Sequence, residues 1–524
     1  MLSNIVFKTQ NFEFPNFVFS KSMATNRFVV AHFEAYQKAR QDFVQGLAEL
    51  AQHPQNVETI KSLGGVALCR SLLMDNVPSI QHSAATALGR IANFSEEMAE
   101  LVVANDVLPQ LVFSLAERNR HYQKAAAFVL RSVARHSPSL AQAVVDAGSL
   151  EPLAICLDEF DPCVKEAAAW ALGYIARHNE HLAQAVVDAG AVPFLIAAAQ
   201  EPELSLKRIA VSALSDISKH TPELAQAVVD AGAISYISPL ISSKDARVRR
   251  QVCSALSQLA KHSVELAELC VEGEIFPRAL LLLRDKDSIT SRNAATLVRE
   301  VVKHTAELAQ LVVNAGGIGA LVEFISVTRG PDRLPGIMAL GFIAAFSETL
   351  ALSIIVAKGV TPLVSCLVSE VEDHVLAATV WTLGQIGRHS PDHAKAICDA
   401  NVLPKLLALF ISESSSDDLR QKAKRSIKFT VQKTTALPAL DPLLFQSPPS
   451  ILKHVVAQYA KILPKDVESR RQFVTSGGLQ KIQSIACEPG TKLYEAIEQC
   501  NACFPDEIVK YYTRKPENML DLIK

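Results

Sequence analysis

Aromatic residues and glycine are both scarce in this chain. Phe, Trp and Tyr make up 6% of its 524 residues, and glycine occurs 21 times. Hydrophobic residues nevertheless make up 49%, so Ala, Val and Leu must form most of any core. This composition is typical of packed helices joined by short loops, and the chain is longer than one compact core usually allows.

An excess of charge of either sign is also lacking. The chain has 52 Lys plus Arg and 54 Asp plus Glu, a formal net charge of −2. Because dedicated nucleic-acid binders are usually strongly basic, we predict no nucleic-acid partner. No run of about 18 apolar residues occurs, and the first twenty residues lack the apolar core of a secretory signal. We therefore predict no membrane partner, and a reducing compartment for the ten scattered cysteines.

Sequence motifs of common enzymes are missing as well. We find no G-x-x-x-x-G-K, H-E-x-x-H or G-x-S-x-G. Cys500 and Cys503 form a lone C-x-x-C without the second pair of ligands that a structural zinc site needs. The sequence thus predicts a protein that is not an enzyme, with no catalytic residue, no metal site and no cofactor.

A repeat is the strongest positive signal. The string LAQAVVDAG begins at Leu140, Leu182 and Leu224, at intervals of 42 residues. A fixed period of this length indicates a solenoid. Weaker copies continue the register on both sides, from Met98, Leu266, Leu308 and, after a one-residue slip, His393.

One repeat, residues 179–220, contains three helical segments. The first ends at Gly190, which suits the left-handed position after a helix, and the third is the longest, with apolar residues three and four apart. Asp161, Asp245 and Asp287 stand where third helices should begin, as N-caps do. Three helices in about 42 residues fit the armadillo repeat better than two-helix repeats. We predict an all-α armadillo solenoid, a right-handed superhelix of about ten three-helix repeats.

Three regions are expected along the chain. Residues 1–27 lie outside the repeat pattern and are predicted to be a disordered N-terminal extension. Residues 28–483 form the solenoid, with an irregular bridge near 436–450, where four prolines fall. Residues 484–524 form a C-terminal capping tail with a short helix around KLYEAIEQ.

Histidine recurs at one repeat position, at the end of each third helix. Because catalytic or metal-binding groups gather in one place whereas these follow the repeat, we interpret them as structural residues that interact with helix-end carbonyls and the helix dipole. They are His136, His178, His220, His262, His304 and His389.

A basic residue precedes each of these histidines, and stacking of the repeats would align the six into a ladder. Two interpretations stay open: the ladder complements helix dipoles, helped by Asp146, Asp188 and Asp230 of neighbouring first helices, or it binds an acidic partner, and we predict that part of it faces such a partner. Its members are Arg135, Arg177, Lys219, Lys261, Lys303 and Arg388.

Several stretches together resemble the sperm-associated antigen six family, armadillo proteins of the ciliary central pair. These include KAAAFVLRSVARHSPSLAQAVVDAG, DPCVKEAAAWALGYIARHN, RLPGIMALGFIAAFSE, DHVLAATVWTLGQIGRHSP and RRQFVTSGGLQKIQ, and the similarity runs from Phe33 to Tyr512. The resemblance implies a structural scaffold of the axonemal central apparatus in motile cilia and sperm flagella, needed for motility. It also implies a cytoskeletal location in the cytoplasm and axoneme, binding to tubulin of the central-pair microtubules and to other central-apparatus proteins, and self-association.

An armadillo adaptor for protein–protein interaction in the cytoplasm, or for nuclear import as in importin-alpha, is the alternative. Importin-alpha proteins carry tryptophan and asparagine at fixed positions of the third helix. Here the tryptophan position keeps only Trp170 and Trp381, and the asparagine position keeps no asparagine. This departure disfavours binding of import cargo.

Overall fold

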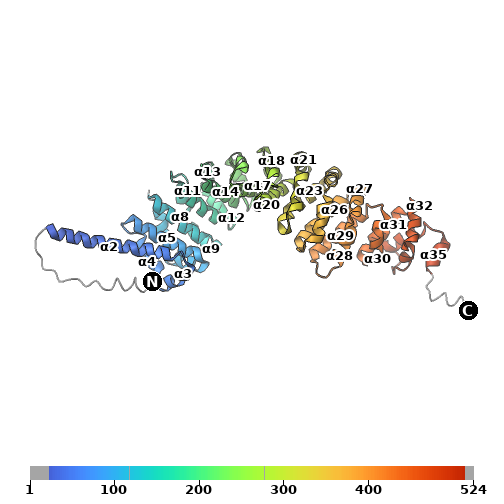
Figure 1. The fold of residues 1–524 in the computed structure, drawn as a ribbon, viewed down its shortest axis with the longest axis horizontal. Helices are drawn as coiled ribbons and strands as arrows, with labels where there is room; N and C mark the ends of the chain where they lie inside the picture. The colour runs from blue at the N-terminus through green and yellow to red at the C-terminus, as the bar shows by residue number, and fades with distance from the viewer. Residues whose placement is uncertain (1–22, 117–118, 277, 514–524) are drawn as a thin grey trace. The chain divides into compact units, whose positions relative to one another are not determined.

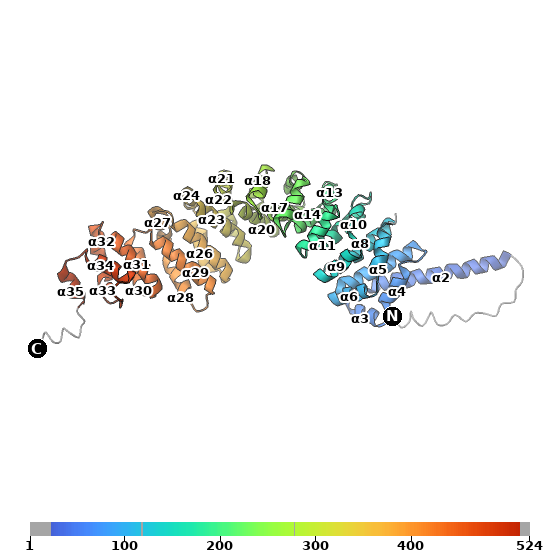
Figure 2. The same ribbon diagram turned by 180° about the vertical axis from the view of Figure 1, so that it is seen from behind.

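The computed structural model describes residues 23–116, 119–276 and 278–513, and in these ranges it contains helices and no strand. The chain divides into two compact units, residues 1–262 and 263–524. In each unit successive sets of three helices repeat along the chain (Figures 1 and 2). The prediction of an all-α solenoid is confirmed.

The first unit opens with a long helix, α2, and continues with five sets of three. The bounds of α2 are Met23–Leu50. The first helices are α3 Pro54–Ser62, α6 Glu96–Ala104, α9 Pro138–Asp146, α12 Glu180–Asp188 and α15 Pro222–Asp230. The second helices are α4 Gly65–Leu72, α7 Leu108–Leu115, α10 Leu150–Cys156, α13 Ala191–Ala198 and α16 Ala233–Ile237, which the 3-10 helix η1 Ser238–Ser242 extends. The third helices are α5 Pro78–Phe94, α8 Arg120–Ala134, α11 Pro162–Ala176, α14 Leu204–Ser218 and α17 Ala246–Ala260.

The second unit has four further sets and then a less regular end. The first helices are α18 Val264–Glu272, α21 Ala306–Asn314, α24 Glu348–Val356 and α27 Pro391–Asp399. The second helices are α19 Arg278–Leu282, α22 Gly317–Val327, α25 Val360–Ser369 and α28 Val402–Ile411. The third helices are α20 Ser288–Val302, α23 Leu334–Phe346 with the 3-10 turn η2 Gly330–Arg333 before it, α26 Asp373–Gly387 and α29 Asp417–Val431. The end consists of α30 Leu437–Gln446, α31 Pro449–Ile462, α32 Val467–Thr475, α33 Gly478–Gln483, α34 Lys492–Asn501 and α35 Asp506–Thr513.

Local signals set the helix boundaries. The side chains of Asp161, Asp245 and Asp287 accept hydrogen bonds from backbone N–H groups of α11, α17 and α20, so the predicted N-caps are confirmed. Gly190, between α12 and α13, has a φ of 71°, and the chain bends there by 84°. This left-handed conformation favours glycine, and it turns the second helix of the repeat away from the first.

The third helices form a continuous layer in each unit. In the first unit α5, α8, α11, α14 and α17 pack in succession, and in the second unit α20, α23, α26 and α29 do (Figure 1). The buried faces are rich in alanine and leucine, as in α11 with Ala168, Ala169 and Leu172. Small residues allow the helix axes to approach closely. The other side of each third helix is left for contacts outside the core.

Two expected boundaries need correction. The irregular bridge predicted near 436–450 is largely helical, because α30 runs through Pro438 and Pro442. Pro438 lies in the first turn, where a missing N–H has no consequence, and Pro442 removes one hydrogen bond while Leu440 and Leu443 are fully buried beside it. At the other end, α2 begins at Met23, so residues 23–27 are helical and do not belong to a disordered extension. The rest of that predicted extension, residues 1–22, lies outside the described residues.

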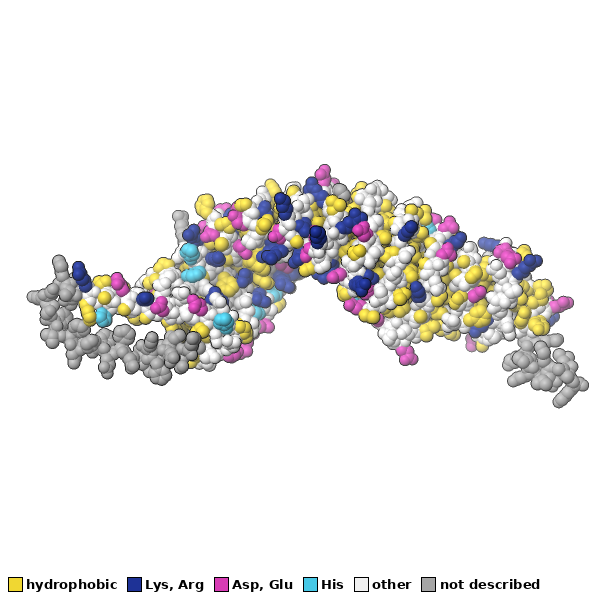
Figure 3. All heavy atoms as spheres, in the orientation of Figure 1, with side chains coloured by type: hydrophobic (Ala, Val, Ile, Leu, Met, Phe, Trp, Pro, Cys, Tyr) yellow, Lys and Arg dark blue, Asp and Glu magenta, His cyan; other side chains and the backbone are white. Residues whose placement is uncertain are grey.

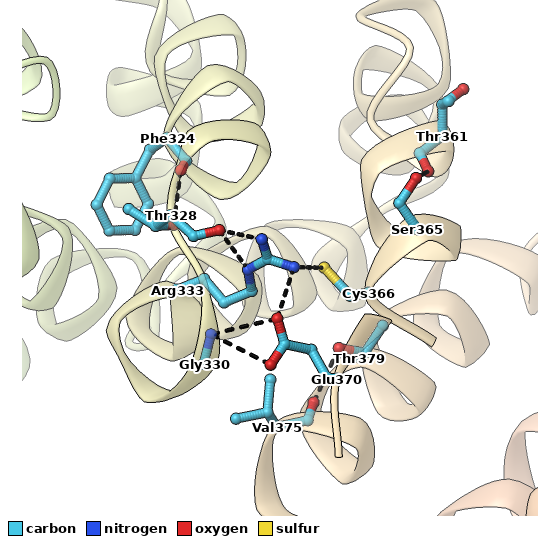
Figure 4. A network of polar contacts seen from close by, with 10 residues as sticks. All are labelled: Phe324, Thr328, Gly330, Arg333, Thr361, Ser365, Cys366, Glu370, Val375 and Thr379. Atoms are coloured by element: carbon cyan, nitrogen blue, oxygen red, sulfur yellow. Dashed lines mark hydrogen bonds and ion pairs between the residues drawn. The ribbon is translucent and has the colours of Figure 1, made fainter. Parts of the chain in front are cut away.

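A buried ion pair joins two successive repeats of the second unit (Figure 4). Arg333, at the end of η2, lies 2.9 Å from the carboxylate of Glu370, which follows α25, and the two side chains are 6% and 8% exposed. Arg333 also donates hydrogen bonds to the carbonyl of Thr328 and to Cys366 Sγ, and the N–H of Gly330 donates to Glu370. The two buried charges therefore pair with each other, and both groups have further hydrogen-bond partners, as burial of charge requires.

We predict that Glu370→Gln lowers the free energy of unfolding of the second unit by about 3–5 kcal/mol, because it leaves the Arg333 charge buried without its counter-ion. Urea denaturation followed by circular dichroism measures this change. Glu323→Gln is the matched control, since Glu323 pairs with Arg284 where both side chains are about half exposed, and such pairs contribute about 0–1 kcal/mol. Equal effects of the two substitutions would contradict the assignment of a buried pair.

Candidate functional site

The recurring histidines cap the helices of the preceding repeat. His178 Nε2 donates a hydrogen bond of 2.6 Å to the carbonyl of Ala134, the last residue of α8, and His220 Nε2 donates one of 2.8 Å to Ala176, the last residue of α11. Helix ends have unpaired carbonyls, so each histidine closes the end of a neighbouring third helix. Equivalent bonds join His136 to Ala92, His262 to Ser218 and His389 to Ala344, and His304 occupies the same position after α20.

Partial burial affects the titration of two of these rings. Burial lowers the pKa of His220 and of His389, although the bond to the backbone carbonyl acts in the opposite direction. A lowered pKa favours the neutral imidazole, which still donates one N–H. The capping bond therefore does not require a charged histidine.

The basic ladder is also tied to neighbouring backbone and side chains. Lys261 Nζ donates to the carbonyl of Lys219 at 2.5 Å, in the preceding repeat, and Lys219 pairs with Asp216 at 3.1 Å. Burial raises the pKa of Asp216, and the charges of Lys219 and Arg177 oppose that rise. Other contacts join Arg135 to Asn93, Arg388 to the carbonyl of Ala345, and Lys303 to Glu300, whereas Arg177 acts on Asp216 through its charge alone among the described contacts.

We expected aspartates of the first helices to supply counter-charges for the ladder, and the described contacts do not agree with this expectation. The carboxylates of Asp146, Asp188 and Asp230 accept hydrogen bonds within their own helices, one turn earlier. Their donors are the side-chain amides of Gln142, Gln184 and Gln226. In the ladder, Lys219 and Lys303 pair with acids of their own third helices, and Arg135, Lys261 and Arg388 donate hydrogen bonds to uncharged oxygens of the preceding repeat.

A stack of aromatic and arginine side chains lies across three third helices of the first unit. The guanidinium of Arg131 is 4.9 Å from the ring centre of Phe128 and 5.4 Å from that of Trp170. Arg208 of α14 lies 5.5 Å from the same Trp170 ring, and Tyr174 stacks on it at 5.4 Å. We call these five residues the aromatic–arginine stack. All are half-buried, and Trp, Tyr and Arg in such settings are the residues that dominate protein interfaces.

A pocket of about 320 Å³ lies on the third helices of the second unit. We call it the Trp381 pocket. Phe342 and Trp381 form its aromatic wall, with ring centres 5.2 Å apart and planes at 69°. Gly341 allows this arrangement, since a Cβ there would lie 2.1 Å from the Trp381 ring. The lining comes from α23, α26 and α29 and consists of Leu334, Met338, Phe342, His374, Ala378, Trp381 and Lys422.

Sequence reasoning missed these two clusters as candidate sites. Trp170 and Trp381 are the only tryptophans of the chain, and they share one repeat position, which was the available signal. That position served only to argue against an import adaptor. Tyr174 lies one turn after Trp170 on the same helix, whereas Phe342 belongs to the preceding repeat and meets Trp381 only when α23 and α26 pack together.

Among residues 23–116, 119–276 and 278–513, no group of three His, Cys, Asp or Glu side chains is arranged to hold a metal ion. Within the same ranges no single helix is long and apolar enough to cross a membrane, whereas five sharply bent helix pairs meet the length and composition test. On the face drawn in Figure 3, acidic and basic side chains are interspersed with exposed hydrophobic ones. The aromatic–arginine stack and the Trp381 pocket make the third helices the candidate interaction surface.

Comparison with known proteins agrees with this architecture. The model of the armadillo/beta-catenin-like repeat matches residues 137–177, 179–219 and 221–261. The chain is 67% identical over 489 residues to Sperm-associated antigen 6 of Homo sapiens, and equally to that of Mus musculus, covering 93% of this chain and 96% of each relative. An engineered protein of known crystal structure has the same fold, with a TM-score of 0.68 and 23% identity over 84% of this chain and 98% of its own.

We predict that His178→Ala lowers the free energy of unfolding of the first unit by about 1 kcal/mol, because the last carbonyl of α8 loses its donor. Urea denaturation of the full chain measures the effect. His181→Ala is the control, since His181 lies exposed on α12 and its loss should change stability by less than about 0.5 kcal/mol. A loss for His178→Ala no larger than that of the control would refute the capping role.

Proposed function

Because the chain belongs to the Sperm-associated antigen 6 family, we propose that it is a non-enzymatic scaffold of the axonemal central pair, required for the beat of motile cilia and flagella. The observation that carries this proposal is the 67% identity over 93% of the chain. Identity of this extent includes the surface of the solenoid as well as its core. Its partners would be tubulin of the central-pair microtubules, other central-apparatus proteins and further copies of the chain.

The third-helix surface supports a role in protein binding. Stacked repeats present a long surface without needing a cleft between domains. In the first unit the aromatic–arginine stack offers rigid rings and guanidinium groups, and in the second the Trp381 pocket offers a recess of about 320 Å³. Such groups supply affinity in proteins that act as scaffolds.

The alternative of a nuclear-import adaptor is disfavoured by the residues that stand where importin-alpha proteins carry asparagine. Tyr174 stacks on Trp170, and Phe342 packs edge-on against Trp381. Asparagine side chains there would hold the backbone of a bound peptide through hydrogen bonds. Tyr174 and Phe342 instead fill the space beside each tryptophan with rings, so a basic import signal would lack those hydrogen-bond partners.

We predict that the tagged protein remains with axonemes after detergent removes the ciliary membrane. Immunoblots of detergent-soluble and axonemal fractions, together with imaging of the tag in motile cilia, measure this distribution. A soluble tag protein expressed in the same cells serves as the control and should be extracted. Recovery in the soluble fraction, or enrichment in nuclei, would favour an adaptor function.

For the basic ladder we propose an internal role, which its contacts with the preceding repeat support. The double variant Lys219→Glu/Lys261→Glu should melt at a lower temperature than the wild type, because glutamate cannot donate to the carbonyl of residue 219 and would repel Asp216. Co-sedimentation with microtubules at a temperature below the melting transition should be unchanged. Weakened, salt-sensitive co-sedimentation with an unaltered melting temperature would instead assign the ladder to an acidic partner.

A further inference from the structure

Helix α29 carries, in its second half, three cations that are partly or fully exposed. Its buried residues include Ala423, Ile427 and Thr430. At about 100° per residue, Arg425 projects away from this buried side, and Lys424 and Lys428 lie along its edge; Arg425 is exposed and the two lysines are half-buried. The guanidinium of Arg425 lies 5.3 Å from the ring centre of Phe429, a contact that holds it against the surface. The only acids in α29, Asp417 and Asp418, belong to its first turn.

The neighbouring helix α31 adds further positive charge. It packs against α29 and carries the exposed Lys453 and the half-buried His454. Burial, and then the charges of Lys453, Lys428 and Lys424, lower the pKa of His454. All the charged groups that influence His454 are therefore cations. We call Lys424, Arg425, Lys428 and Lys453 the basic face.

Carboxylates within the described part of the second unit do not neutralise this face. Lys422 pairs with Asp418 at 2.7 Å, and Arg420 donates to the carbonyls of Ser412 and Glu413. Among the described ion pairs of residues 278–513, in contrast, none includes a member of the basic face. Adjacent cations repel one another, so an anionic ligand would find charges that are already assembled.

The basic face continues from the Trp381 pocket. Lys422 lines that pocket beside α26. Lys424 and Lys428 instead lie near α31, where their charges lower the pKa of His454. The two features thus occupy the two sides of one helix, α29. A ligand lying across α29 would meet an aromatic recess at one end and a group of cations at the other.

We propose that this surface binds an extended acidic peptide segment of a partner protein. One bulky apolar side chain of the segment enters the Trp381 pocket, and its carboxylates pair with the basic face. This inference rests on the proposed scaffold function and gives the chemistry of one partner. A peptide fits better than a nucleic acid, because the pocket is lined mainly by apolar side chains and the chain as a whole carries a net charge of −2.

Binding of a fluorescein-labelled peptide to the purified full chain tests the proposal. The probe is a twelve-residue peptide, about forty ångströms when extended, with one central Phe and glutamate at most other positions. Fluorescence anisotropy at low and high salt measures its affinity. We expect saturable binding that weakens with salt, about tenfold weaker binding when Phe is replaced by Ser, and loss of binding when Gln replaces every Glu.

Two variants separate the parts of the site. Lys424→Glu/Lys428→Glu should weaken binding of the probe about tenfold or more, and Met338→Trp, which fills the pocket, should abolish the advantage of Phe over Ser. The matched control is Lys395→Glu/Lys405→Glu, with the same change of charge on α27 and α28 of the same repeat. Melting curves identify any variant that fails to fold, and the two variants act through different helices.

Three results would overturn the proposal: no binding of the probe to the wild type, equal weakening by the control variant, or tighter binding of a DNA oligonucleotide of equal charge. None of these bears on whether the protein resides in the axoneme. Failure of this inference is therefore distinguishable from failure of the proposed function. If the protein binds the probe through this surface but is recovered in the detergent-soluble fraction, the peptide site stands and the proposed axonemal location fails.

Discussion

Packing of successive third helices against one another within each unit is the interaction on which the structure depends. A helix such as α11 has alanine on the sides that meet α8 and α14, with Ala168, Ala169 and Ala171 all fully buried. Alone, one repeat cannot remove this surface from water, and stacking of repeats is what produces a core. Scarcity of aromatic residues follows from the same constraint, because large rings between the helices would separate them.

Close stacking brings helix ends of successive repeats together, and this explains the recurring histidines. The carbonyl of Ala134 would be unpaired at the end of α8, but His178 of the next repeat reaches it. Three of the bases before the histidines, Arg135, Lys261 and Arg388, also reach the preceding repeat, Lys261 by donating to the carbonyl of Lys219. Charge and hydrogen bonding at these ends therefore serve the junctions between repeats.

The candidate interaction surface is the side of the third helices that faces away from the core. In the first unit, Arg131 lies between Phe128 and Trp170 on that side. In the second, Gly341 makes room for Trp381, and the resulting recess adjoins the cations of α29. A scaffold can in this way carry different binding surfaces along one chain, since each depends only on two or three adjacent repeats.

The sequence by itself determined the repeat, its three helices and their caps. These depend on interactions over a few residues, such as Asp161 with the N–H of Cys163, and on a period that recurs unchanged. Family membership was also accessible, because the quoted stretches extend over most of the chain. The helix through Pro442 was missed, since its stability comes from burial of Leu440 and Leu443 against other helices and not from local propensity.

Only the tertiary structure decided which side chains meet across repeats. The sequence placed each histidine at a helix end, but the helix that it caps belongs to the repeat before it, 44 residues earlier for His178. Asp188 looked available to the basic ladder, yet it is bonded to Gln184 within its own helix. The Trp381 pocket and the basic face likewise arise from residues on several helices. Distances between such residues are fixed by how the repeats stack, which a linear pattern does not contain.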